Sequence, residues 1–229
     1  HMIVVWVGLA LAQGLFVVDD PAGVSLFLLA SILLSISLIP ILLTEIKAPE
    51  LDVQESLGLR ALWKASPSGV ATIGLSGLAS AGFFGVGTIY AVKAGLSVSE
   101  TALFMTLFIG FGAASQWPLG WLSDKIDRRK VIMFCCASVI CICTVLASFE
   151  FTSKILLILS ALVGAFTLPL YSLGVAQSND RLEPKQMISA SGTIVLVFSV
   201  FAALGPFTMS YFLQLFEMFG FMLYMGIVH

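Results

Sequence analysis

The chain has 229 residues, of which 59% are hydrophobic and only 10% are charged, and its mean hydropathy is +1.06. Soluble domains carry about 25% charged residues, so this chain could not cover itself with polar surface, and the composition indicates an integral membrane protein. The net charge of −2 says little because its distribution matters more in a membrane, and nothing in the composition favours nucleic-acid binding.

Eight apolar stretches are long enough to cross a hydrocarbon core of ~30 Å, which takes ~20 helical residues. In chain order they are 2–18, 23–43, 70–94, 101–122, 131–149, 155–177, 187–204 and 211–228. The last two are separated by a few uncharged residues, yet a single helix over 187–228 would be roughly twice as long as a bilayer is thick. We therefore predict a reversal at Gly205-Pro206 and an all-α fold with eight transmembrane helices.

A longer segment, 44–69, lies between the first two spans and the following six and predicts a linker. Within it, leucines and Trp63 alternate with Arg60 and Lys64, which suits a helix at the membrane surface with the aromatic ring and the cations at headgroup level. A solvated linker is the alternative.

Lysine and arginine residues are concentrated in alternate loops, which predicts the orientation of the chain. Nine of the eleven lie in 44–69, 123–130 and 178–186, whereas Lys93 and Lys154 lie in the intervening loops. Because cations are retained on the cytoplasmic side of a bilayer, we expect these three segments to be cytoplasmic.

The loop 120–130 places four cations and two carboxylates between two uncharged spans. It resembles the G-x-L-(S/A)-D-(R/K)-x-G-R-(R/K) loop of the major facilitator superfamily, whose members are secondary transporters built from two halves of six helices. The residues that match this signature, to which the resemblance assigns a gating role, are Gly120, Leu122, Ser123, Asp124, Lys125, Arg128 and Arg129. The chain departs from it at Asp127, where the family has glycine.

The position of this loop implies how much of the family fold is present. In the family, a cytoplasmic linker follows the sixth helix, and the signature loop recurs between the second and third helices of each half. The resemblance therefore implies that 1–43 holds the last two helices of an N-terminal half, 44–69 is the cytoplasmic central linker and 70–229 is the C-terminal six-helix half. The eight spans would be helices five to twelve, and the four missing N-terminal helices would be partners from the same protein.

Other features extend the resemblance. The stretches 116–120, 167–173 and 189–192 resemble a poorly characterised bacterial branch close to multidrug-efflux-like members. The chain begins with His1, so we expect either a fragment or a truncated chain in which His1-Met2 is a cloning remnant.

The family resemblance implies an electrostatic latch at this loop. Alternating access requires helix ends to join and release, and Asp124 can interact with the N-terminal end of a neighbouring helix and with loop cations. Gly120 is expected to permit close helix approach, and Arg128 and Arg129 to pair with carboxylates or anionic headgroups. Asp127 could add a pairing with Arg128 or Lys130. The alternative is that the loop only fixes the topology.

No charged residue lies in the middle of the five spans between 70 and 204, where a charge would cost about 2.5 to 3.5 kcal/mol. Neutral groups must therefore line any solute path through this half. The candidates are Tyr90, Gln116, Trp117, Thr167, Tyr171, Ser172 and Thr193. For each of them, a helix–helix hydrogen bond or an interface anchor is an equally good interpretation.

Three further groups of residues have two interpretations each. Glu217 in the last span is either a solvated interfacial residue, which we favour, or a protonatable group facing a cavity. Prolines and glycines within the spans either loosen helices or permit close packing, which is the default; they are Pro118, Pro169, Gly82, Gly85 and Gly87. The four cysteines lie in one apolar span with no carboxylate or histidine nearby, so we expect packed or lipid-facing thiols and no metal.

Together these features predict secondary active transport of a small solute by alternating access in a bacterial inner membrane. The resemblance implies proton coupling and efflux of an amphipathic compound, with no cofactor. The alternatives are a non-transporting membrane sensor and a membrane-embedded enzyme. An enzyme would need clustered Asp, His or Cys residues at a membrane face, and the loop 120–130 contains neither His nor Cys, so no enzyme is expected.

Overall fold

The computed structural model describes residues 8, 24–43, 57–149 and 152–229, and its regular structure in these ranges is helical. Five helices are long and apolar enough to cross a membrane, as the composition predicts. They are α4 (Pro67–Lys93), α5 (Val98–Lys125), α6 (Arg128–Ser148), the span Ser153–Asn179 formed by α7 (Ser153–Thr167) and α8 (Pro169–Asn179), and α9 (Pro184–Val228). The count of eight membrane helices is not confirmed, since the predicted span 2–18 lies outside the described residues apart from Gly8.

Helix α2 (Ser25–Leu42) occupies most of the predicted span 23–43. Large apolar side chains on every side of it are exposed, among them Phe27, Leu34 and Leu38. A helix that is apolar all round requires a hydrophobic environment, which a bilayer supplies. α2 therefore has the character of a membrane helix.

The short helix α3 (Leu59–Ala65) lies where the sequence predicts a surface helix. Leu62 is fully buried against the start of α4 and the start of α9, while Trp63 remains 52% exposed. Before the helix begins, the Leu57 N–H donates to the Ser189 carbonyl at 3.3 Å, and the Thr193 hydroxyl donates to the Leu57 carbonyl at 2.6 Å. Residues 57–66 are thus docked on the bundle, and the alternative of a merely solvated linker is wrong for this part.

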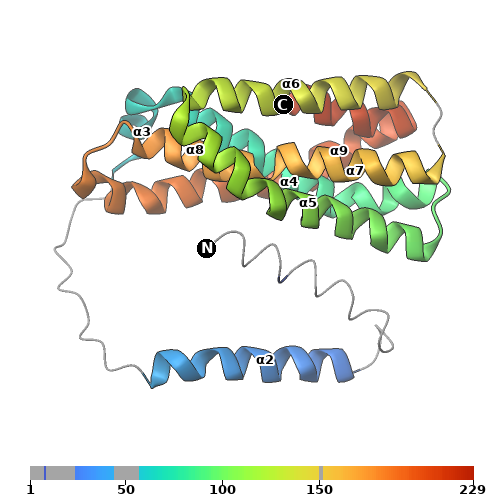
Figure 1. The fold of residues 1–229 in the computed structure, drawn as a ribbon, viewed down its shortest axis with the longest axis horizontal. Coiled ribbons are helices and arrows are strands. Elements are labelled where there is room, and N and C mark those ends of the chain that lie inside the picture. Colours follow the sequence, from blue (N-terminus) through green and yellow to red (C-terminus); the bar gives the residue numbers. More distant parts are fainter. Residues whose placement is uncertain (1–7, 9–23, 44–56, 150–151) are drawn as a thin grey trace.

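Helices α4 to α9 form a bundle (Figure 1), and within it α4 packs against α9. A Cβ atom on Gly205 would lie 2.6 Å from the Leu78 carbonyl oxygen and 2.8 Å from the Gly82 nitrogen. One on Gly85 would lie 2.7 Å from Pro206 Cβ. Small residues allow two helix backbones to approach in this way, which confirms the packing interpretation of Gly82 and Gly85.

The chain reverses at Glu217 and not at Gly205-Pro206, so that prediction was wrong. Glu217 has φ 51° and ψ −135°, which interrupts the helical backbone of α9. Beyond it, the Tyr224 hydroxyl lies 2.9 Å from the Thr208 hydroxyl, although 16 residues of straight helix would separate them by roughly 24 Å. The helix continues through Pro206, which has no N–H to donate to the Ala202 carbonyl and which packs against α4 at Gly85.

Helices α7 and α8 form one span with a break at Leu168-Pro169. Pro169 has no N–H, so the Ala165 carbonyl, four residues earlier, lacks its helical donor. The Ser115 hydroxyl of α5 donates to that carbonyl at 2.7 Å. Neighbouring side chains commonly satisfy backbone groups freed by proline in membrane helices, and α5 does so here.

Candidate functional site

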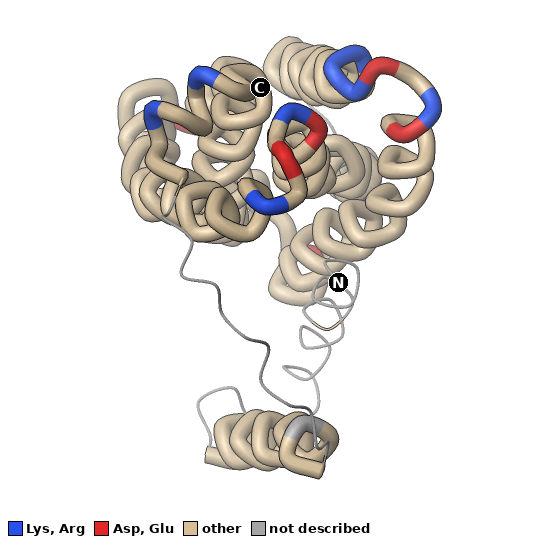
Figure 2. Tube along the Cα trace, turned by 90° about the vertical axis from the view of Figure 1, so that its left-hand side faces the viewer, with Lys and Arg blue, Asp and Glu red and all other residues tan. Residues whose placement is uncertain are grey.

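Charged residues gather at one end of the bundle (Figure 2). Eight of the ten described Lys and Arg residues lie there, in α3, at the α5–α6 connection and in the α8–α9 connection. Lys93 and Lys154 lie at the opposite end, where α4 stops and α7 starts. The described parts of the three basic segments that alternate along the sequence therefore lie at one end of the bundle.

A two-residue connection, Ile126 and Asp127, joins α5 to α6. Asp127 is the N-cap of α6, and its carboxylate accepts the Arg129 N–H at 3.0 Å. Aspartate is among the preferred N-cap residues because its side chain satisfies one of the free N–H groups of the first turn. Its φ of −53° suits any residue, so glycine is not needed here, and Asp127 forms an ion pair with neither Arg128 nor Lys130.

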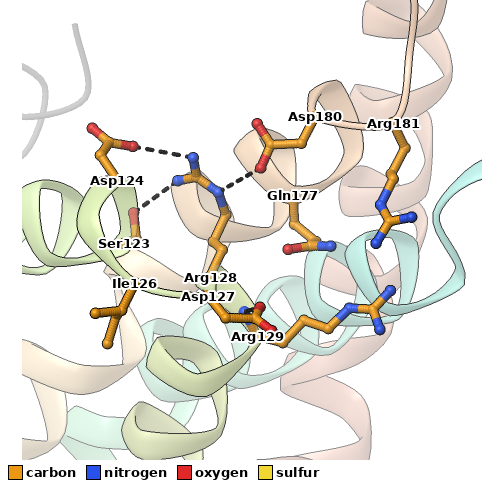
Figure 3. A pocket seen from close by; sticks show the side chains of 9 residues that line it. All are labelled: Ser123, Asp124, Ile126, Asp127, Arg128, Arg129, Gln177, Asp180 and Arg181. Atoms are coloured by element: carbon orange, nitrogen blue, oxygen red, sulfur yellow. Dashed lines mark hydrogen bonds and ion pairs between the residues drawn. The ribbon is translucent and has the colours of Figure 1, made fainter.

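Arg128, the first residue of α6, joins three groups (Figure 3). Its Nη2 donates to Asp124 Oδ1 at 3.1 Å, and its Nη1 donates to Ser123 Oγ at 2.7 Å, both at the end of α5. Its Nε donates to Asp180 Oδ2 at 3.0 Å, directly after α8. One guanidinium group therefore ties together the ends of α5, α6 and α8. We call Ser123, Asp124, Arg128 and Asp180 the Arg128 network.

The Arg128 network combines a half-buried cation with hydrated anions. The Arg128 side chain is only 14% exposed, whereas those of Asp124 and Asp180 are 70% and 52% exposed. Water can replace Arg128 as the partner of either carboxylate, so breaking one of these ion pairs leaves no buried unpaired anion. Charge-assisted bonds fix the geometry while they last, yet the network can open at low cost.

The other signature residues have different roles in the structure. Lys125 lies with its Nζ 3.8 Å from the centre of the Trp121 ring, a cation–π contact outside the network. Leu122 packs on the apolar cluster that contains Leu119 and Val131. A Cβ atom on Gly120 would meet no described atom within 4 Å, so the expected close approach at this glycine is wrong for the part of the chain that is described.

Three residues that line the same cavity are not among those that the sequence predicts for the site. Asp180, Gln177 and Arg181 come from α8 and the connection that follows it, and the cavity of about 450 Å³ also contains Arg129. The signal available in the sequence was that 178–186 is a second basic loop on the same side as 123–130. Sequence alone does not say that these two loops touch.

Two residues of the candidate solute path come together at the proline break. The Ser172 hydroxyl donates to Gln116 Oε1 at 3.0 Å, and Gln116 Nε2 donates to the Leu168 carbonyl at 3.4 Å. Both side chains are half-buried between α5 and α8. They form the helix–helix hydrogen bonds of the alternative interpretation, on an edge of the bundle that remains partly open.

The remaining path candidates are dispersed. Tyr90 is buried in the core, with its ring stacked on Phe221 at 4.3 Å, and Thr167 is also buried, with its hydroxyl 3.1 Å from His229 Nε2. Tyr171 packs edge-on against Phe198 near the docked linker, where Thr193 holds Leu57, and Trp117 is 72% exposed on the bundle surface. The structure therefore gives no single lining surface that contains all seven.

Glu217 is exposed at the reversal of α9. Of the four cysteines, Cys135 and Cys143 are buried, Cys136 is half-buried and Cys141 is exposed, all as free thiols. Within the described ranges, no group of three or more His, Cys, Asp and Glu residues could hold a metal ion.

The sequence model of the Major Facilitator Superfamily matches residues 69–229, which include all but the first two residues of the bundle. The chain belongs to the major facilitator superfamily. It is similar to proteins named "Uncharacterized MFS-type transporter YcaD", with 25% identity over 210 residues for that of Salmonella arizonae and 23% over 208 residues for that of Escherichia fergusonii. Each alignment covers 90% of this chain and 53% of the relative, so the chain spans about half the length of the curated relatives it matches. No solved structure gives a significant match.

Membership of this transporter superfamily favours a transporter over an enzyme. It also gives the helical bundle a membrane setting and a multi-pass topology, which agrees with the five apolar spans. Bacterial relatives named as transporters make a bacterial membrane the natural location.

Proposed function

We propose that this superfamily member moves a small solute across the bacterial inner membrane by alternating access, with the Arg128 network as one latch at its cytoplasmic end. The observation that carries the proposal is the bridge from Asp124 on α5 through Arg128 on α6 to Asp180 after α8. Such a bridge fixes three helix ends in one state and can be hydrated in another. A loop that served only to fix topology would not require this geometry.

The sidedness of the latch is part of the proposal. Its support is the concentration of eight described cations at one end of the bundle, because Lys and Arg are retained on the cytoplasmic side. The two-half plan of the family adds four N-terminal helices. The surface that these helices present to the C-terminal half would complete the solute path. We place 1–43 in the N-terminal half, 44–69 as the linker and 70–229 as the C-terminal half.

We further propose proton-coupled efflux of an amphipathic compound. The charged residues of the described spans lie at helix ends or at the Glu217 reversal, so a solute passing this half meets apolar and neutral polar groups. Gln116 and Ser172 are the polar pair best placed to contact it, since both remain half-buried. The proton-binding carboxylate would then lie in the N-terminal helices.

The test compares carboxylate-to-amide variants of the intact protein at equal membrane abundance. Asp124→Asn and Asp180→Asn should each lower the initial transport rate several-fold, because each removes one arm of the bridge while keeping side-chain size. Glu183→Gln is the matched control, since Glu183 is exposed at the same end of the bundle but lies outside the cavity. Rates that stay at the wild-type level in both Asp variants would exclude the latch.

A further inference from the structure

One polar side chain beside the Arg128 network, that of Gln177, reaches the cavity without bonding to a described residue. Gln177 is 4% exposed, and its side-chain amide forms no hydrogen bond with any described residue. Figure 3 shows this amide beside the Arg129 and Arg181 side chains, at the wall of the cavity. The Gln177 amide atoms are not among the fully buried unpaired side-chain atoms of the described residues, so the small exposed part of this residue opens on the cavity, where the amide can bond to solvent or to a ligand.

Two arginines in the cavity are also free to bind an anion. Within the described ranges, ion pairs are formed by Arg128 alone, and these occupy the carboxylates of Asp124 and Asp180. Asp127 uses a carboxylate oxygen to cap α6. The guanidinium groups of Arg129 and Arg181 therefore face the cavity without a described carboxylate partner.

The size and position of the cavity indicate what could occupy it. Its volume of about 450 Å³ has room for a phosphate group and several waters, at ~30 Å³ per water. Trp121 lies near the end of α5, beside the cavity residues Ser123 and Asp124. Its side chain is 53% exposed, with Lys125 Nζ over the ring, and such aromatic residues mark the headgroup level of a bilayer. The cavity therefore opens where phospholipid headgroups would lie.

We infer that Arg129, Arg181 and Gln177 bind a phosphate group. Two guanidinium forks supply paired donors that match phosphate oxygens, and the Gln177 amide supplies a further N–H. The source is either the headgroup of an anionic phospholipid or free phosphate. Arg129 lies on α6 and Arg181 follows α8, so the bound group ties the same two segments that Arg128 ties to each other. This regulatory consequence rests on the proposed latch, whereas the binding itself does not.

Native mass spectrometry of the intact protein in detergent, with added phosphatidylglycerol or phosphatidylcholine, tests the site. We expect preferential binding of phosphatidylglycerol, and a loss of about five-fold in its affinity for each of Arg129→Gln and Arg181→Gln. Gln177→Glu should weaken binding as well, because it places an anion against the phosphate. Lys130→Gln is the matched control: it removes an exposed cation next to Arg129 that does not line the cavity.

Inorganic phosphate distinguishes the two sources. If millimolar phosphate raises the melting temperature of the wild type but not of Arg181→Gln, while the two lipids bind equally, the site takes free phosphate. If phosphate has no such effect and phosphatidylglycerol is preferred, it takes the lipid headgroup. The inference is overturned if neither ligand distinguishes wild type from Arg181→Gln, or if Lys130→Gln loses as much binding as Arg129→Gln. These binding results do not depend on transport rates, so they separate this inference from the latch.

Discussion

The glycine-lined helix crossings and the Arg128 network hold the same bundle together by opposite means. At Gly205 and Gly164 the backbone of one helix lies against that of another, with no room for even a Cβ atom. At the charged end, Arg128 reaches carboxylates that are 70% and 52% exposed. Contacts of the first kind cannot be exchanged for water, whereas contacts of the second kind can.

This difference separates what must stay fixed in a moving half from what can change. Helices that are closely packed against each other move together as one rigid body, because no other packing arrangement keeps the same contacts. Exposed ion pairs at helix ends have such an alternative in water and neighbouring charges. The comparison predicts that substitutions in the interior lower stability strongly without a selective loss of transport. Substitutions at the charged end should lower the transport rate with little loss of stability.

The largest effect is expected from Gly164→Val. A Cβ atom there would lie 2.6 Å from the Phe108 carbonyl carbon and 2.7 Å from its Cα, so α5 must move away from α7. We expect a loss of about 3 kcal/mol in unfolding free energy, or no folded protein. Gly110→Val on α5 is the control, because a Cβ there meets no described atom within 4 Å. Melting temperatures followed by size-exclusion chromatography decide it; equal values for the two variants would contradict the close packing.

Arg128→Gln should cost much less stability. It removes two ion pairs whose carboxylates stay hydrated, each worth about 0.2 to 1 kcal/mol, so we expect a total loss of about 1 kcal/mol. Transport should fall even so, because the bridge to Asp180 is lost. Thermal unfolding measured beside Lys130→Gln, together with transport at equal abundance, checks both statements. A destabilisation as large as that of Gly164→Val would show that the charged end is structural.

A smaller effect is expected from Ser115→Ala at the proline break. It leaves the Ala165 carbonyl without its donor, and interhelical hydrogen bonds in membrane proteins average about 0.6 kcal/mol. Ser138→Ala is the control, since the Ser138 hydroxyl is exposed and donates only within its own helix, to Phe134. Thermal unfolding of the two variants should differ by this amount. No difference would mean that α5 does not support the break.

The smallest effect is expected from Glu217→Gln. The Glu217 side chain is exposed at the reversal of α9. Its replacement therefore removes no buried charge and leaves no described partner without a bond. Melting temperature, transport rate and pH profile should all match the wild type. A variant that binds solute but no longer responds to an imposed pH gradient would instead make Glu217 part of the proton path.

The sequence predicted the helical class and the approximate position of five spans because hydrophobic length and the placement of charged loops are local properties. The match at 120–130 likewise located Ser123, Asp124 and Arg128. It did not locate Asp180, which lies 52 residues from Arg128 and becomes its partner only through the packing of α8 beside α5 and α6. The reversal was misplaced because Gly-Pro is a common turn signal, while Glu217 at a positive φ is an uncommon one.

The sequence by itself determined that the chain is helical, suited to a membrane and basic in alternate loops, since these follow from residue type and spacing. Only the tertiary structure decided which loops meet and which glycines carry close contacts. Gly164 and Gly120 are both glycines within apolar stretches of sequence. A Cβ atom on the first would meet Phe108, whereas one on the second would meet no described atom within 4 Å. A glycine's role depends on what faces it across the interface, and that is set by how the helices pack.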